Sequence, residues 1–136
     1  MIKEEYTKKD TGTRIRWKPD LEVFTDINVP LEYFQSTLKR QAIVNSGVRF
    51  VLRNQKGNTN SFETYEYLYE NGIKDYVDEL GGDTSISQTQ LWSAERVGRD
   101  REDQKDYKLK INIALRFSNK TQLKEYYQNS SFLEHG

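Results

Sequence analysis

One short stretch of the chain matches an enzyme signature, the Asp-Thr-Gly triplet at 10–12. This triplet is typical of aspartic proteases, in which two carboxylates share one proton, so the chain would have to dimerise to supply the second aspartate. The protease turn is also apolar, whereas Lys8, Lys9 and Arg14 flank this one. We therefore interpret the triplet as a polar turn that leads into a strand.

The other chemistry-bearing residues do not predict a complete active site. His135 is the only imidazole, and the chain has no Cys, which excludes thiolate zinc sites, iron–sulfur clusters and cysteine nucleophiles. The glycine spacing fits neither a P-loop nor a dinucleotide fingerprint. Tyr65, Tyr67 and Tyr69 share one face of an expected strand and could stack nucleobases, but a half-buried sheet face is commoner and no basic stripe accompanies them. The sequence alone thus predicts no catalytic residue and no metal site.

Length and charge narrow the class of protein. With 136 residues the chain suits one domain or two partial ones. Its 21 Lys+Arg balance its 21 Asp+Glu, so the net charge is zero and gives no overall attraction for nucleic acid. No run reaches the ~18 apolar residues of a membrane span, and the first residues do not form a signal peptide. The absence of Cys fits a cytoplasmic protein. We expect a folded, cytoplasmic chain without a membrane segment.

The hydrophobic pattern predicts an α+β fold made of antiparallel hairpins and two short amphipathic helices. A break at 71–72 is the one plausible domain boundary. We expect the second helix and the last long strand to pack together through their apolar sides. The expected elements are a strand at 13–17, a helix from Pro30 to Ala42 closed at Gly47, a hairpin of 48–53 with 62–69, a helix at 73–80 closed by Gly81 and Gly82, a hairpin of 88–97 with 107–117, and a strand near 126–127.

Four stretches, taken together in their order and spacing, resemble a known family. They read TGTRIRWKPDLEVF at 11–24, LKRQAIVNSGVRFVL at 38–52, YENGIKDYV at 69–77 and IALRFSN at 113–119. They resemble the B subunits of bacterial type II DNA topoisomerases, those of DNA gyrase and of topoisomerase IV, over roughly residues 9–136.

The resemblance implies a division of the chain. Residues 1–71 are similar to the C-terminal part of a GHKL-type ATPase domain, and residues 72–136 to the N-terminal part of a ribosomal-protein-like transducer domain. The family's Mg-holding helix, its D-x-G-x-G turn and its Gly-rich lid have no counterpart here. We therefore expect the fragment alone to be inactive and to bind neither ATP nor Mg²⁺.

Two residues match family contacts to the nucleotide. Thr13 resembles the threonine that hydrogen-bonds, with an ordered water, near the adenine edge, and Ile15 resembles an apolar residue of the same pocket. In a strand, residues i and i+2 point to one face, so the two side chains would enter one cavity together.

For the parent protein the resemblance implies an ATP-hydrolysing topoisomerase that couples ATP binding and hydrolysis to DNA strand passage. It implies ATP and Mg²⁺ as cofactors, and DNA, a gyrase A-type subunit and a second copy, bound through the ATPase domain, as partners. A different interpretation stays open from the residues themselves: a free-standing, non-enzymatic α+β protein-interaction domain.

Overall fold

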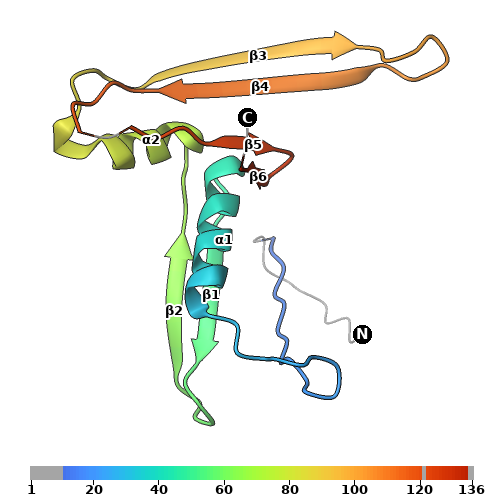
Figure 1. Ribbon diagram of the computed structural model, residues 1–136, viewed down its shortest axis with the longest axis vertical. Coiled ribbons are helices and arrows are strands. Elements are labelled where there is room, and N and C mark those ends of the chain that lie inside the picture. The colour runs from blue at the N-terminus through green and yellow to red at the C-terminus, as the bar shows by residue number, and fades with distance from the viewer. Residues whose placement is uncertain (1–10, 121, 135–136) are drawn as a thin grey trace.

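The computed structural model describes residues 11–120 and 122–134 and has the predicted α+β fold (Figure 1). Two α-helices, a short 3₁₀ helix and antiparallel two-stranded sheets make up the described part of the chain. In chain order the elements are α1 (Leu31–Val44), β1 (Phe50–Gln55), β2 (Phe62–Tyr67), α2 (Ile73–Gly81), the 3₁₀ helix η1 (Gly82–Thr84), β3 (Gln90–Gly98), β4 (Tyr107–Leu115), β5 (Tyr126–Gln128) and β6 (Ser131–Leu133).

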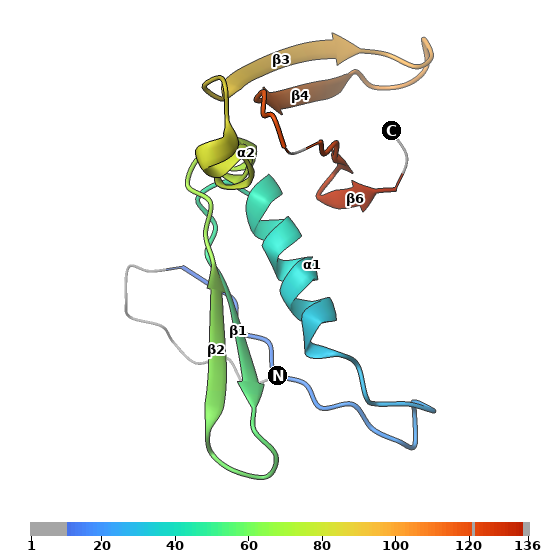
Figure 2. The ribbon, with the colours of Figure 1, turned by 60° about the vertical axis from the view of Figure 1, so that its left-hand side comes forward.

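Helix α1 lies along one face of the β1–β2 hairpin (Figure 2). Pro30 precedes the first turn, where a missing N–H removes no helical hydrogen bond, and Gly47 turns the chain with a φ of 76°. Along β1 and β2 every second residue is half-buried, Tyr65 and Tyr67 among them. The tyrosines thus belong to an ordinary half-buried sheet face, as the period of two predicts.

The core lies where the C-terminal end of α1 meets the end of β2 and the start of α2. Ala42 and Ile43 are 0% and 2% exposed, and Tyr69 is 8% exposed. Partly buried side chains surround them on both sides of position 71, namely Val44, Phe50, Tyr67, Ile73 and Tyr76. The domain boundary at 71–72 stays a prediction. Residues from both sides of that boundary pack in one core.

The strand predicted at 13–17 does not form. Residues 11–20 contain no strand, and Ile15 and Trp17 are 81% and 58% exposed. A strand is stable only when a neighbour completes its hydrogen-bond ladder, and no described segment pairs with this one. The segment contacts helix α1 through aromatic rings, and the ring centroids of Trp17 and Phe34 are 5.8 Å apart.

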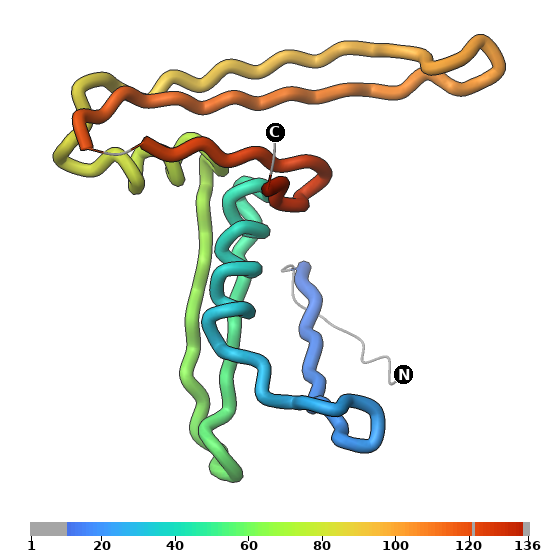
Figure 3. The backbone as a smooth tube through the Cα atoms, in the orientation of Figure 1, coloured from blue at the N-terminus to red at the C-terminus, as the bar shows by residue number. Residues whose placement is uncertain are grey.

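The β3–β4 hairpin is the longest feature of the structure and extends across the end of the α1 and β1–β2 unit (Figure 3). Helix α2 and β4 do lie together, and Arg116 Nη1 is 3.1 Å from Asp78 Oδ1. The apolar face of β4 is nevertheless not covered by α2, since Ile111 and Ile113 remain 38% and 45% exposed. The predicted neighbours are therefore correct, and an arginine just after the strand adds an ion pair to their contact, while the apolar face of β4 stays partly exposed.

The C-terminal strand near 126–127 is confirmed as β5, and β6 completes a small hairpin with it. Asn129 and Ser130, with φ of 47° and 67°, form the two-residue turn between them. Positive φ at both central residues is the geometry whose twist matches paired antiparallel strands.

Candidate functional site

Thr13 and Ile15 lie together in the strandless segment at 11–20, and both are exposed. The described residues form a groove between α2, β4 and residues 123–133, and a small cavity beside it. Neither Thr13 nor Ile15 lines the groove or the cavity. Their role as adenine contacts therefore stays a prediction. Two other residues singled out in the sequence, Asp10 and His135, lie outside the described residues.

The metal ion that accompanies a nucleotide is held by acidic side chains that lie close together. Phosphoryl transfer depends on a positioned cradle of donors and on metal-holding acids. In the part of the chain that the structure describes, no group of three or more His, Asp or Glu residues could hold a metal ion. The described acidic residues therefore form no cluster that could hold the metal ion by itself.

The polar centre of the structure is a network that we call the tyrosine–carboxylate junction, formed by Lys39, Tyr69, Tyr76, Glu79, Glu125 and Tyr127. Glu79 on α2 accepts a hydrogen bond from Lys39 Nζ of α1 at 2.8 Å and another from the Tyr69 hydroxyl at 2.6 Å. The Tyr69 and Tyr76 rings meet edge to face, 6.0 Å apart.

The second half of the junction attaches the C-terminal hairpin. Glu125 accepts hydrogen bonds from the hydroxyls of Tyr76 and Tyr127, at 3.3 and 2.8 Å. On the α1 side, Gln41 Nε2 donates to the Ser130 carbonyl at 2.8 Å. Three elements that are far apart in the sequence, α1, α2 and β5, are thereby held to one another.

The electrostatics of the junction favour a fixed connection rather than acid–base chemistry. Burial, with a hydrogen bond to a carboxylate, raises the pKa of Tyr69 and of Tyr127 far above its usual value. Burial alone would raise the pKa of Glu79, but the hydrogen bonds from Lys39 and Tyr69 outweigh it and lower that pKa. At neutral pH the Tyr69 hydroxyl therefore keeps its proton and donates a hydrogen bond to the ionised Glu79 carboxylate.

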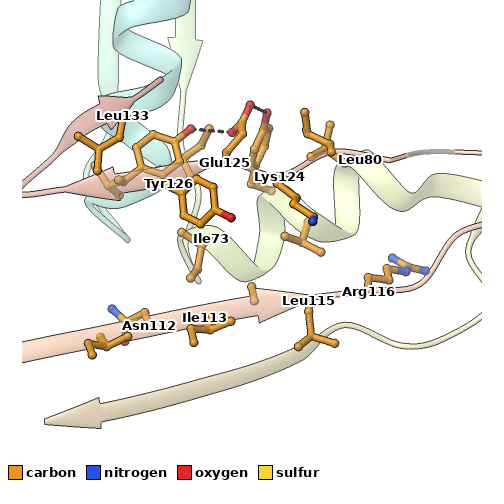
Figure 4. A pocket seen from close by; sticks show the side chains of 18 of the residues that line it. Ile73, Leu80, Asn112, Ile113, Leu115, Arg116, Lys124, Glu125, Tyr126 and Leu133 are labelled. Atoms are coloured by element: carbon orange, nitrogen blue, oxygen red, sulfur yellow. Dashed lines mark hydrogen bonds between the residues drawn. The ribbon is translucent and has the colours of Figure 1, made fainter. Parts of the chain in front are cut away.

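A groove of about 1000 Å³ adjoins the junction, between α2, the end of β4 and residues 123–133 (Figure 4). The apolar side of α2, with Ile73, Val77 and Leu80, forms one wall. Dashed lines in Figure 4 mark the hydrogen bonds at Glu125, which belongs to the segment 123–133. The groove combines an apolar wall with a few fixed polar groups, which is the usual composition of a binding surface.

Sequence reasoning did not find this junction. It assigned no role to Glu79 or Glu125. The partners are 10, 40 and 49 residues apart, so no local spacing links them. The only available signal was the placement of Tyr69 and Tyr76 next to the break at 71–72.

Glu79 makes stability depend on pH. Because its folded pKa lies below the ordinary 4.5, its stabilisation is complete above about pH 4.5 and is lost as the pH falls through the lower, folded value. We expect the free energy of unfolding of the wild type to fall more between about pH 7 and pH 3 than that of Glu79→Gln, measured by urea denaturation. All other carboxylates are common to both proteins. If the free energy of unfolding falls equally with pH in both, Glu79 does not accept the hydrogen bonds from Lys39 and Tyr69.

Comparison with known proteins identifies relatives of the chain. No family model matches it. The chain is 40% identical over 80 residues to the DNA gyrase B subunit of Staphylococcus aureus, and 36% identical over 80 residues to that of Staphylococcus epidermidis. Each match covers 58% of this chain and 12% of the relative, so the chain spans about an eighth of the length of these curated relatives. None of the described helices is long and apolar enough to span a membrane. The chain is thus gyrase B-like over the 80 residues that match.

Proposed function

We propose that the chain forms the connection between the ATPase and transducer domains in a B-type subunit of a type II topoisomerase. Residues 1–71 would end the GHKL-type ATPase domain and residues 72–136 would begin the transducer. The observation that carries this proposal is the 40% identity over 80 residues to a gyrase B subunit.

The geometry supports a connecting role. The core and the tyrosine–carboxylate junction both combine residues from before and after position 71. A movement of α1 would therefore be transmitted to α2 through Lys39, Glu79 and Tyr69, and onward to β5 through Glu125. A closely packed element of this kind moves as a unit rather than deforming gradually.

In the parent protein the proposed activity is ATP-driven DNA strand passage, with ATP and Mg²⁺ as cofactors. DNA, a gyrase A-type subunit and a second copy of the B-type subunit are the proposed partners, in the cytoplasm. Thr13 would place its hydroxyl near the adenine, and Ile15 would form an apolar wall of the same pocket.

Thr13→Ala tests the adenine role. In a gyrase B subunit in which residues 11–136 replace the corresponding segment, loss of one placed hydrogen bond costs about 0.5–1.5 kcal/mol, which weakens ATP binding roughly 2- to 10-fold. Thr25→Ala, at an exposed position outside 11–20, is the matched control and should leave the affinity unchanged. Calorimetric titration with a non-hydrolysable ATP analogue measures both, and equal affinities for the Thr13 and Thr25 variants would remove Thr13 from the pocket.

A non-enzymatic interaction domain is the second candidate function. The exposed apolar face of the β3–β4 hairpin favours it, because such faces on monomers usually mark interaction sites. The two functions are compatible, since one concerns the core junction and the other a separate surface.

A further inference from the structure

Asn71 and Gly72 form the one Asn–Gly pair of the chain, directly before α2. An asparagine followed by glycine is especially prone to spontaneous deamidation, because glycine has no side chain to shield its main-chain nitrogen. That nitrogen can attack the asparagine side chain and close a five-membered ring. The pair is therefore a candidate modification site whose chemistry needs no enzyme and no reactant other than water.

The reaction has two steps. The Gly72 nitrogen loses its proton to solvent and forms a bond to Cγ of Asn71, while the bond from Cγ to Nδ2 breaks and the amide nitrogen leaves as ammonia with a proton from solvent. Water then opens the ring. Attack of water at Cγ gives aspartate, and attack at the main-chain carbonyl carbon gives isoaspartate, in which the main chain runs through the side chain. In sum, asparagine and water become aspartate or isoaspartate and ammonia.

The asparagine side of this reaction is restrained by Asp75 in the first turn of α2. Asn71 Nδ2 donates hydrogen bonds to Asp75 Oδ1 at 2.9 Å and to Oδ2 at 3.3 Å, and the main-chain N–H of Asn71 donates to Oδ2 at 2.7 Å. We call this arrangement the Asp75 clamp. It resembles a capping box, in which an acidic residue of the first helical turn reaches back to a main-chain N–H. The clamp holds the amide group that would have to turn toward Gly72 and leave.

The nucleophile is restrained as well. The N–H of Gly72 donates a hydrogen bond to the Tyr69 carbonyl at 3.1 Å, and Gly72 is buried. The space around its Cα is small, because an added Cβ would lie 3.0 Å from the Ile43 carbonyl oxygen and 3.1 Å from Ser46 Cβ. A hydrogen-bonded nitrogen in a closely packed turn neither loses its proton readily nor moves toward a neighbouring side chain.

From these contacts we propose that Asn71–Gly72 is a deamidation site that the native fold keeps unreactive, with the Asp75 clamp as the main restraint. Ring closure then requires the start of α2 to open locally. The rate of deamidation at Asn71 therefore follows the population of the open form, in the same way as other reactions of transiently opened segments.

The products would alter the connection between the two predicted domains. Aspartate at position 71 lacks the Nδ2 donor and places a second carboxylate against Asp75, and like charges four residues apart are unfavourable. Isoaspartate adds a carbon atom to the main chain next to Gly72, where α1 approaches closely. The inference concerns residues 69–75 alone, so it can fail without affecting the proposed topoisomerase function.

A second Asn–Gly pair in the same chain provides an internal reference. Lys56→Asn places an asparagine before Gly57, at the exposed tip between β1 and β2, where an added Cβ at Gly57 meets nothing within 4 Å. The variant is incubated at neutral pH, and peptide mass spectrometry follows deamidation at positions 56 and 71 over time. We expect position 56 to react several-fold faster than Asn71 in the folded protein. In concentrated urea the two rates should become similar.

Removing the clamp tests the role of Asp75. In the Lys56→Asn background, Asp75→Ala should raise the rate at Asn71 several-fold and leave the rate at position 56 unchanged. Asp83→Ala, which removes an exposed carboxylate just after α2, is the matched control and should change neither rate. Circular dichroism checks that each variant is folded. If Asp75→Ala unfolds, Asp75→Asn decides, because it keeps one acceptor oxygen and should give a smaller increase at Asn71.

Two results would overturn the proposal. Equal rates at positions 56 and 71 in the folded protein would mean that the native fold does not protect the pair. An unchanged rate at Asn71 in a folded Asp75 variant would mean that the Asp75 clamp is not the restraint.

Discussion

Replacing Ile43 by alanine should lower the free energy of unfolding by about 2–5 kcal/mol, the range for removing a large aliphatic side chain from a packed core. Ile43 is 2% exposed and is the one large side chain in the described part of the chain that is fully buried. Ala42 and Tyr69 pack in the same cluster, so the lost carbon atoms would leave a cavity that the neighbours on α1, β1, β2 and α2 cannot fill. Urea denaturation followed by circular dichroism measures the change.

Ile15→Ala is the matched control, with the same atoms removed from a side chain that is 81% exposed. Its effect should stay within about 0.5 kcal/mol. Similar midpoints for the two variants would mean that the core does not lie at the end of α1.

Replacing Gly72 by alanine should lower the free energy of unfolding by about 1–3 kcal/mol through backbone strain alone. The φ of 58° and ψ of −127° at this position lie in a region that only glycine adopts without strain. An added Cβ would also lie 3.0 Å from the Ile43 carbonyl oxygen and 3.1 Å from Ser46 Cβ. The turn into α2 would have to shift away from α1. The same denaturation experiment gives the size of the loss.

Gly12→Ala provides the comparison for Gly72. An added Cβ at Gly12 meets nothing within 4 Å, so this substitution should change stability by less than about 1 kcal/mol. If Gly72→Ala lowers the free energy of unfolding no more than Gly12→Ala does, α1 does not approach the start of α2 as closely as described.

The periodic elements could be predicted from the sequence. Both helices and the two long hairpins form near their expected positions, because their apolar period and their Gly and Pro boundaries agree with their packing. The strand at 13–17 has the same local signal but does not form, since a strand depends on a partner that local pattern does not reveal. The turn at Asn129 and Ser130 was missed because neither residue is glycine, the usual residue for positive φ.

The candidate site was harder to predict. The junction depends on hydrogen bonds between residues up to 49 positions apart, and a surface glutamate with such a partner looks like any solvated charge in sequence. The predicted role of Thr13 and Ile15 as adenine contacts came from a family resemblance, and neither residue belongs to the junction that the structure shows. The exposure of the apolar face of the β3–β4 hairpin could be recognised only from the structure, although the period of the strands predicted that face.

The most direct test of the proposed function is DNA supercoiling by a chimera. Residues 11–136 would replace the corresponding segment of the Staphylococcus aureus gyrase B subunit, and the chimera would be assembled with the gyrase A-type subunit. We expect ATP-dependent supercoiling by the chimera, and we expect Glu79→Leu to reduce supercoiling more than ATP hydrolysis, because it removes the acceptor shared by Lys39 and Tyr69. A folded chimera that binds ATP and the A-type subunit but supercoils no DNA would contradict the account.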